Sequence, residues 1–266
     1  MTRPARRRLA IAMRAILIAS LAIPFVVPAA TASTETDGEA ALLTWINDAR
    51  AARGLVPLRR DASLTAIAGL RAGRMASANT LSHTVAGSLT TQLGSLNVQW
   101  YRYGETIGYS TAGWSIDAAR WVFRSWMGSS MHRALLMSDR FNYIGVGLAF
   151  RSANARTFAS VVMTESNDHT RPVARVSGTT RSGTTIHWSW AGYDARLQTH
   201  WAGLRDYDLL YRVGFGAWVL LRNDTTATGI TLLNRAHGQS YAIRVRATDR
   251  RGNVGAWSPE SRITVP

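Results

Sequence analysis

The spacing of apolar residues changes near Pro172, and this change constrains the fold more than any other feature of the 266-residue chain. Upstream, apolar residues recur every three or four positions, as on one face of an amphipathic helix. Downstream, they alternate with polar residues, as in strands with one buried face. A single helix or strand cannot have both a period of three to four residues and a period of two. We therefore predict an α+β protein with a mixed helix-and-strand domain at residues 38–166 and an all-β sandwich at residues 171–266.

The first 32 residues have the three parts of a secretory signal peptide. Basic residues such as Arg3 open the segment, an apolar run follows from Ala15 to Val27, and Ala30 and Ala32 supply the small residues of a cleavage site. The run is shorter than the about 20 residues that a membrane-spanning helix needs. We therefore expect a secreted, extracellular protein with no membrane span in the mature chain.

Composition excludes several functions. All 31 basic residues are arginine, and they are scattered along a chain whose net charge is +15. A nucleic-acid reader gathers its basic residues in a stripe within a recognisable motif, so we expect no nucleic-acid binding, whereas association with an anionic cell wall fits this charge. The absence of cysteine excludes disulfides, thiolate metal sites and a cysteine nucleophile.

The first domain is expected to contain three helices and two closing strands. These elements are helices over 39–53, from Asp61 to about Asn79 and over 116–128, followed by strands over 143–150 and 157–163. Asp61 and Ser115 are suitable N-caps, because their side-chain oxygens can accept backbone N–H groups at a helix start. Trp121 and Trp126 are expected in the core.

The second domain is expected to direct alternate aromatic and aliphatic residues inward. Arg244 and Arg246 occupy the other positions of one such strand and should face solvent. A long stretch from Ala191 to Arg205 should form an enlarged loop between two strands. No catalytic constellation is found in this domain, so we interpret it as a spacer or adhesion module.

A series of short motifs in the first domain has a familiar order. They are N-x-x-R at Asn47 and Arg50, S-H-T around His83, GETIG from Gly104 to Gly108, M-H-R around His132 and IGVG from Ile144 to Gly147. With this order and spacing, residues 40–165 resemble the bacterial, SCP-like branch of the CAP superfamily, named for cysteine-rich secretory proteins, antigen 5 and plant pathogenesis-related proteins. The resemblance implies an α-β-α sandwich with a central antiparallel sheet and a cleft. The run from Gly238 to Pro259 resembles a bacterial fibronectin type III domain.

The CAP resemblance implies that His83, Glu105 and His132 face the cleft. Two imidazoles and a carboxylate can ligate a divalent metal such as zinc, or perform general acid–base catalysis. They can also bind an anion or a polar head group. Structural interpretations remain open: His83 follows a helix end whose dipole favours a cation, Glu105 lies in a glycine-bounded loop, and His132 lies just past a helix end.

The chain also departs from the family pattern. Ser129 stands where eukaryotic members place a second acid, and the strand over 157–162 lacks their second histidine. The G-x-S-x-G and H-E-x-x-H patterns of hydrolases are absent from the sequence. IGVG predicts a strand in which glycines permit a close backbone approach.

Three functions remain open. We expect a secreted, non-enzymatic protein whose cleft binds an extracellular lipid, glycan or peptide. The alternative is a secreted, metal-assisted hydrolase that acts on a polymer or peptide through His83, Glu105 and His132. The third is a structural adhesin that works through its basic β-sandwich. The sequence does not identify the ligand.

Overall fold

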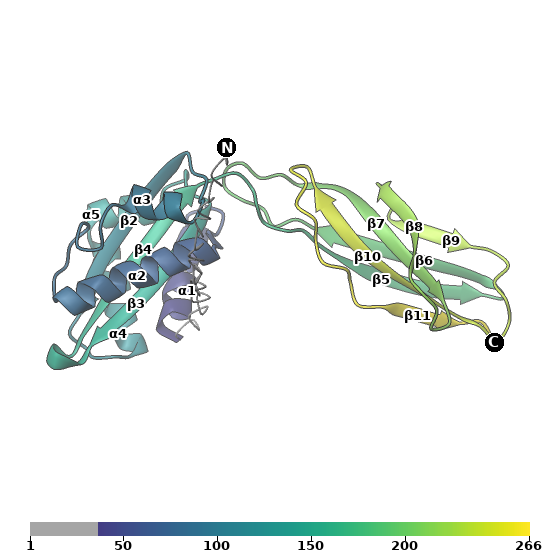
Figure 1. Cartoon of the computed structure of the whole chain (residues 1–266), viewed down its shortest axis with the longest axis horizontal. Coiled ribbons are helices and arrows are strands. Elements are labelled where there is room, and N and C mark those ends of the chain that lie inside the picture. Colours follow the sequence, from purple (N-terminus) through teal and green to yellow (C-terminus); the bar gives the residue numbers. More distant parts are fainter. Residues whose placement is uncertain (1–36) are drawn as a thin grey trace, which may run out of the picture. The chain divides into compact units, whose positions relative to one another are not determined.

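The computed structural model describes residues 37–266, so the predicted signal peptide at residues 1–32 lies outside the described residues. A mixed α/β domain is followed by an all-β domain (Figure 1). The predicted α+β fold class is therefore confirmed. Within residues 37–266, no helix combines the length and apolar character needed to cross a bilayer.

The first domain interleaves helices with strands. In chain order its elements are α1 (Asp37–Ala51), β1 (Arg59–Arg60), α2 (Ala62–Ala78), α3 (Leu89–Ser95), β2 (Arg102–Ser110), α4 (Ile116–Gly128), α5 (Ser130–Leu136), β3 (Tyr143–Arg151) and β4 (Arg156–Glu165). Helices α1, α2 and α4 correspond to the three predicted helices. The expected caps are also present, because Asp61 accepts the Leu64 N–H at 2.8 Å and Ser115 accepts the Ala118 N–H at 3.3 Å.

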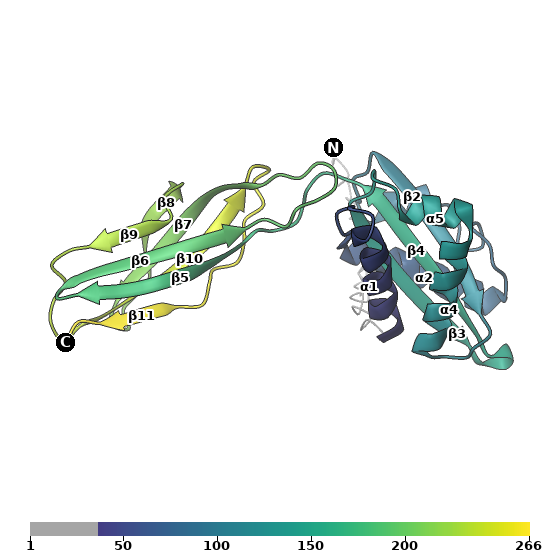
Figure 2. The same cartoon turned by 180° about the vertical axis from the view of Figure 1, so that it is seen from behind.

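The four strands form one sheet in the order β1-β3-β4-β2. Strand β4 is antiparallel to both β3 and β2, and the two-residue β1 is parallel to β3. Helix α2 covers one face of the sheet, and α1 and α4 cover the other (Figures 1 and 2). Alternation along β4 sends Val162 into the core under α2, and Val161 and Met163 into the core under α1 and α4. This is the α-β-α sandwich that was expected.

The glycines of the IGVG motif allow α2 to lie directly on β3. A Cβ atom at Gly145 would lie 2.0 Å from the backbone carbon of Leu64, and one at Gly147 would lie 2.3 Å from that of Ala68. Cβ atoms do not approach other atoms this closely, so only glycine fits at either position. The predicted close backbone approach is confirmed.

Two local expectations for this domain are wrong, and a third is incomplete. Glu105 lies on strand β2, paired with Val162 of β4, and not in a loop. His132 lies past the end of α4, as expected, but in the first turn of a further helix, α5, that was not expected. Trp121 is 54% exposed, whereas Trp126 is 2% exposed, because residues five positions apart lie about 140° apart around a helix.

The second domain consists of two packed antiparallel sheets. Its strands are β5 (Val173–Ser182), β6 (Thr185–Tyr193), β7 (Leu204–Val213), β8 (Val219–Thr225), β9 (Gly229–Leu232), β10 (Ser240–Asp249) and β11 (Ser261–Thr264). One sheet has the order β5-β6-β9 and the other β11-β10-β7-β8. Trp188 and Trp190 from the first sheet and Ile243 and Val245 from the second are buried between them. The domain is the fibronectin type III-like sandwich that was expected, with the long loop lying between β6 and β7.

The outward-facing arginines of β10 are not simply solvated, contrary to expectation. Arg244 and Arg246 are half-buried. The Arg244 guanidinium lies 4.9 Å from the ring centroid of Trp218, and that of Arg246 lies 4.5 Å from Trp257. Stacking of this kind stabilises a cation over an aromatic face and covers its stem. Much of the basic charge in this domain is therefore partly covered by aromatic rings.

Candidate functional site

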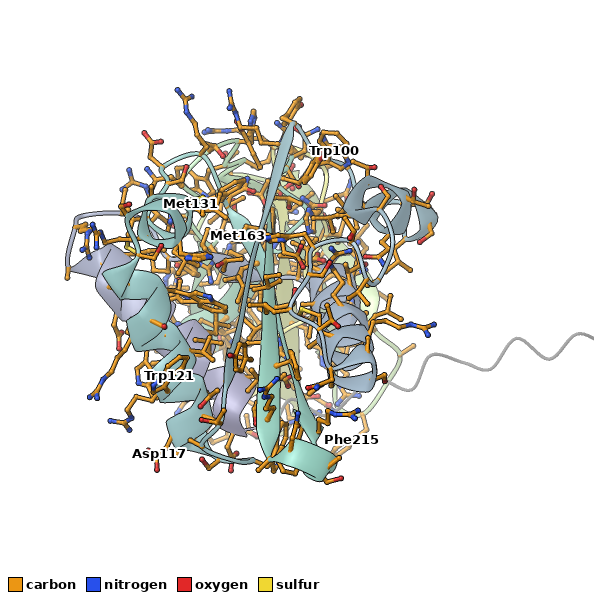
Figure 3. The ribbon with its side chains drawn as sticks, turned by 90° about the vertical axis from the view of Figure 1, so that its left-hand side faces the viewer. Trp100, Asp117, Trp121, Met131, Met163 and Phe215 are labelled. Atoms are coloured by element: carbon orange, nitrogen blue, oxygen red, sulfur yellow. The ribbon has the colours of Figure 1, made fainter. Side chains whose placement is uncertain are left out.

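A cavity of about 710 Å³ lies between β2 and α5. Aromatic residues at the start of β2 form one wall, and apolar residues of α5 form the other. The lining comprises His83, Trp100, Tyr101, Arg102, Tyr103, Glu105, Met131, His132, Ala134, Leu135, Ser138, Arg140 and Phe141. Figure 3 shows Trp100 and Met131 near the same end of the first domain, with Trp121 toward the other end. His83, Glu105 and His132 thus all line one cavity, although they come from a loop, a strand and a helix.

Glu105 is held at the base of the cavity by an arginine that the sequence analysis did not select. The Glu105 side chain is 5% exposed, and that of Arg71 is 2% exposed. Nε of Arg71 donates to Oε1 at 2.6 Å, and Nη2 donates to Oε2 at 2.9 Å. Such a bidentate pair fixes both the position and the plane of the carboxylate.

The remaining donors of Arg71 tie this pair to the loop that follows α2. Nη1 donates to the carbonyl of Gly87 at 3.1 Å and to Oε1 of Gln92 at 2.9 Å, and Nη2 donates to the carbonyl of His83. Each guanidinium nitrogen therefore has at least one acceptor. A buried cation that is satisfied in this way organises the loop from which His83 enters the cavity.

The pKa of the Glu105 carboxyl lies below its usual value. Burial alone would raise this pKa, but hydrogen bonds from Arg71, His83 and Ser160, together with the charge of Arg71, outweigh that effect. Charged and hydrogen-bonded neighbours favour the ionised form of an acid. The carboxylate is therefore an anion at neutral pH.

His83 is oriented by this carboxylate. Its Nδ1 lies 2.7 Å from Oε2 of Glu105, and its side chain is 57% exposed. When Nδ1–H donates to the carboxylate, a neutral imidazole presents the lone pair of Nε2. Histidines that bind metals commonly have such a carboxylate behind them.

His132 lies on the wall shared with a second, smaller cavity. This neighbouring cavity has a volume of about 260 Å³, and its lining includes His132, Trp121 and Tyr109. Nδ1 of His132 is buried and has no hydrogen-bond partner among the residues that the structure describes.

The acceptor positions of Glu105 decide whether it can ligate a divalent metal. Oε1 of Glu105 accepts from Arg71 and from Ser160 Oγ, and Oε2 accepts from Arg71 and His83. Because a carboxylate has about four acceptor positions, protein donors already use all of those on Glu105. His83 and Glu105 are in contact, but together with His132 they do not form one of the groups of residues 37–266 whose ligand atoms lie within 4.8 Å of one another. The residues therefore do not form a ready three-ligand metal site.

Two features of this site were missed from the sequence. Arg71 follows Leu64 and Ile67 on the apolar stripe of α2 and precedes Met75. An arginine on such a stripe signals a buried cation that needs an acidic partner. The aromatic run at residues 100–103, directly before GETIG, signals an exposed wall, but its partner wall on α5 comes only from tertiary packing.

An α-β-α sandwich with a histidine-containing cavity beside its sheet, followed by a fibronectin type III-like sandwich, defines a CAP-type domain with an appended β-module. Residues 43–164 match the model of the family described as the cysteine-rich secretory protein family, CAP. The first domain therefore matches the CAP family over residues 43–164, as its motifs indicated. Comparison with curated protein sequences gives no match.

Several solved structures are similar to one domain or the other. An outer surface protein from Borrelia burgdorferi is 18% identical with a TM-score of 0.44, and the match covers 50% of this chain and 97% of that chain. An extracellular protein containing an SCP domain from Bacillus anthracis str. Ames is 21% identical with a TM-score of 0.42, and the match covers 48% of this chain and 40% of that chain. The third fibronectin III domain of a human protein is 15% identical with a TM-score of 0.29, over 37% of this chain and 86% of that chain. Because these TM-scores are all below 0.5, the assignment of the two folds depends on the order and pairing of the elements described above.

Proposed function

We propose that the chain is a secreted CAP-domain protein that binds an extracellular ligand in the cavity between β2 and α5 and does not transform it. The signal-peptide pattern at residues 1–32 supports secretion. The descriptions of two similar structures as an outer surface protein and an extracellular protein support it as well. The observation that carries the proposal is the cavity itself, which combines exposed aromatic side chains with a polar base that the protein has already neutralised.

The chemistry of the base favours binding over catalysis. A general acid or base works best when its pKa lies near the operating pH. Glu105 is instead fixed as an anion by Arg71, and its pKa is lowered. Its acceptor positions are filled, so it has no free position from which to take a proton from a substrate or a water.

The walls indicate an amphipathic ligand. Met131 is 74% exposed, Tyr103 is 41% exposed and Trp100 is 38% exposed. A ligand that covers exposed apolar side chains in a concave site removes apolar surface from water, which favours binding. The imidazoles of His83 and His132 would meet the polar end of that ligand. Of the expected lipid, glycan or peptide, a lipid with a small polar head fits this division best.

The test is a titration monitored by tryptophan fluorescence. Dodecanoate, a tetramer of N-acetylglucosamine and trialanine would represent the three ligand classes. We expect dodecanoate to bind and Trp100→Ala to weaken its binding at least about tenfold, since an aromatic wall contributes more than about 1.4 kcal/mol at such sites. Trp114→Ala is the matched control, because Trp114 is also exposed and does not line the cavity. Equal loss in both variants, or no binding of any probe, would contradict the proposal.

A metal-assisted hydrolase is the second candidate, and the hydrogen bond between His83 and Glu105 is the observation that favours it. A divalent ion such as zinc would activate a bound water and polarise a carbonyl. Calorimetry with zinc on the wild type, His83→Ala, His132→Ala and the surface control His187→Ala tests this. Binding should weaken below about pH 6, because an imidazole must lose its proton to ligate. Equal affinity in all four proteins would remove this candidate without affecting the first.

A further inference from the structure

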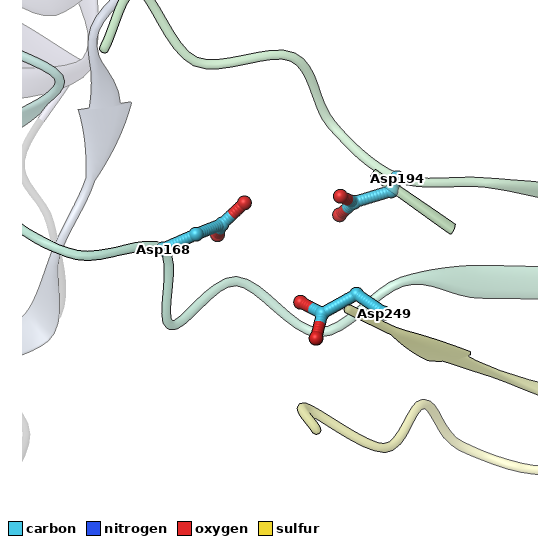
Figure 4. Close-up of side chains that lie close together, drawn as sticks. All are labelled: Asp168, Asp194 and Asp249. Carbon is cyan, nitrogen blue, oxygen red and sulfur yellow. The ribbon is translucent and has the colours of Figure 1, made fainter. Parts of the chain in front are cut away.

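Three aspartates from separate segments meet beside the β-sandwich. Asp168 lies in the segment between β4 and β5, Asp194 directly follows β6, and Asp249 ends β10. One carboxylate oxygen from each lies within 4.8 Å of the other two. Figure 4 shows the three carboxylates directed toward a common space. The residues are only 3%, 4% and 0% exposed, so water screens their mutual repulsion weakly.

Two of these carboxylates are fixed by protein donors. Asp168 accepts from the hydroxyl of Tyr143 and from the backbone N–H groups of Thr170 and Ala202. Asp249 accepts from the N–H groups of Arg251 and Asn253 and from the Asn253 side-chain amide. Each carboxylate thus uses three of its about four acceptor positions and keeps one oxygen with a free lone pair.

Asp194 is different, because it is buried and almost without partners. Its Oδ2 accepts the Gly203 N–H at 2.7 Å, whereas its Oδ1 is buried and accepts no hydrogen bond from the residues that the structure describes. A buried carboxylate oxygen without a donor destabilises the fold, because it has lost its hydrogen bonds to water and has no protein donor to replace them. This unpartnered oxygen belongs to the carboxylate that faces Asp168 and Asp249 in Figure 4.

Among the described residues, basic side chains interact with this group only without direct contact: Arg205 acts on Asp249 and His169 acts on Asp168 through their charges. Within residues 37–266, no arginine or histidine forms an ion pair with Asp168, Asp194 or Asp249. Burial, followed by the charge of Asp168, raises the pKa of Asp194, and hydrogen bonding to the Gly203 N–H and the Trp201 side chain offsets the rise only in part. Three carboxylates that share a dry space require either a proton or a bound cation.

We propose that Asp168, Asp194 and Asp249 form a calcium-binding site. The donor set consists of oxygen alone, which suits a hard cation. Oxygens that lie within 4.8 Å of one another can all reach one ion with bonds of about 2.4 Å, the length that calcium forms. Magnesium demands shorter bonds of about 2.0–2.1 Å in an octahedron, and zinc prefers sites with nitrogen or sulfur. The ion would give Oδ1 of Asp194 the partner that it lacks.

A calcium ion here would join three pieces of chain. Asp168 belongs to the segment that leads into β5, while Asp194 and Asp249 end two strands from opposite sheets of the sandwich. The side-chain amide of Asn253 already donates to the backbone carbonyl of Asp168 at 3.1 Å. The ion would add a stronger cross-link at the same place and protect this segment from local opening.

The proposal is tested with the full chain by thermal unfolding and calorimetry. We expect a dissociation constant of about 10⁻⁴ M, as in extracellular calcium modules. Addition of about 10 mM calcium, about 100 times that value, should then raise the unfolding temperature by roughly 5 °C over a chelator-treated sample. Asp194→Asn should weaken binding at least about tenfold, since it removes the charge that has no other partner. Asp139→Asn is the control, because Asp139 is a carboxylate with a 68% exposed side chain.

A second measurement needs no variant. Terbium replaces calcium at oxygen sites and emits when a nearby tryptophan is excited, and Trp201 lies close to Asp194. Sensitised terbium emission that calcium displaces, and that magnesium displaces at least about tenfold less well, would support the site. No thermal shift with calcium, equal responses in Asp194→Asn and Asp139→Asn, or equal displacement by magnesium would overturn the assignment. If calcium produces no thermal shift, the three carboxylates hold a proton in place of the ion.

Discussion

Replacing Arg71 with methionine tests whether this arginine builds the base of the cavity. Methionine keeps an apolar stem of similar length but removes every hydrogen bond that the guanidinium makes. Two of these bonds go to Glu105, whose side chain is 5% exposed and would remain as a buried anion without its counter-charge. Removing one partner of a buried ion pair costs about 3–5 kcal/mol. We expect the free energy of unfolding to fall by about that amount.

The pH dependence of this loss has a definite sign. In the wild type, the folded-state pKa of Glu105 lies below its ordinary value of 4.5. The resulting stability is present above pH 4.5 and is lost as the pH falls through the lower, folded-state pKa. Without Arg71, burial dominates and the pKa rises, so a proton can relieve the buried charge. The stability difference between Arg71→Met and the wild type should therefore shrink as the pH falls from about 7 toward 4.5.

Urea unfolding monitored by tryptophan fluorescence measures both effects. Arg74→Met is the matched control, because Arg74 lies on the same helix and is exposed; it should change stability by less than about 0.5 kcal/mol. Combining Arg71→Met with Glu105→Gln should cost less than the sum of the single changes, since the two residues form one unit. A loss below about 1 kcal/mol for Arg71→Met at neutral pH, or a loss that does not shrink with pH, would refute the reasoning.

Two further changes test the core around the site by the same unfolding assay. Gly145→Ala should cost about 3 kcal/mol or prevent folding, because its Cβ would lie 2.0 Å from the Leu64 backbone. Gly73→Ala on α2, where the added Cβ meets nothing within 4 Å, should stabilise by up to about 1 kcal/mol, so equal effects would contradict this packing. Trp126→Phe should cost about 1–3 kcal/mol, since the indole N–H donates to the buried carbonyl of Ile107 at 2.9 Å; an unchanged stability would show that the bond contributes nothing.

Local patterns predicted α1, α2, α4, β3 and β4 of the first domain, because these patterns depend on period and capping within one segment. They did not predict α3, α5, β1 or β2. The helix over 116–128 and its Ser115 cap are found where the apolar spacing placed them. The same reasoning failed at Trp121, since a helix that packs on only one side buries only part of its aromatic residues. Periodicity therefore identifies an element but not every side chain that the element buries.

The motif around Glu105 failed for a different reason. Two glycines that bound a short polar run are typical of a loop. In the structure, both glycines lie on strand β2. They are glycines there because residues of neighbouring helices occupy the space that a side chain would need. A Cβ at Gly104 would lie 2.9 Å from Leu135, and one at Gly108 would lie 2.9 Å from Trp126. These contacts join distant segments, so a local pattern could not distinguish a turn from a close approach.

The two acidic sites differ in how far the protein itself satisfies them, and this decides which one needs a cation. Glu105 receives four hydrogen bonds and the charge of Arg71. Asp194 receives the Gly203 N–H at one oxygen and faces two further carboxylates. Counting acids along the sequence cannot separate these cases, because the donors come from residues far away in the chain. Removal of divalent ions should accordingly lower the stability of the segment that Asp168 joins to the sandwich, while the pair of Arg71 and Glu105 remains intact.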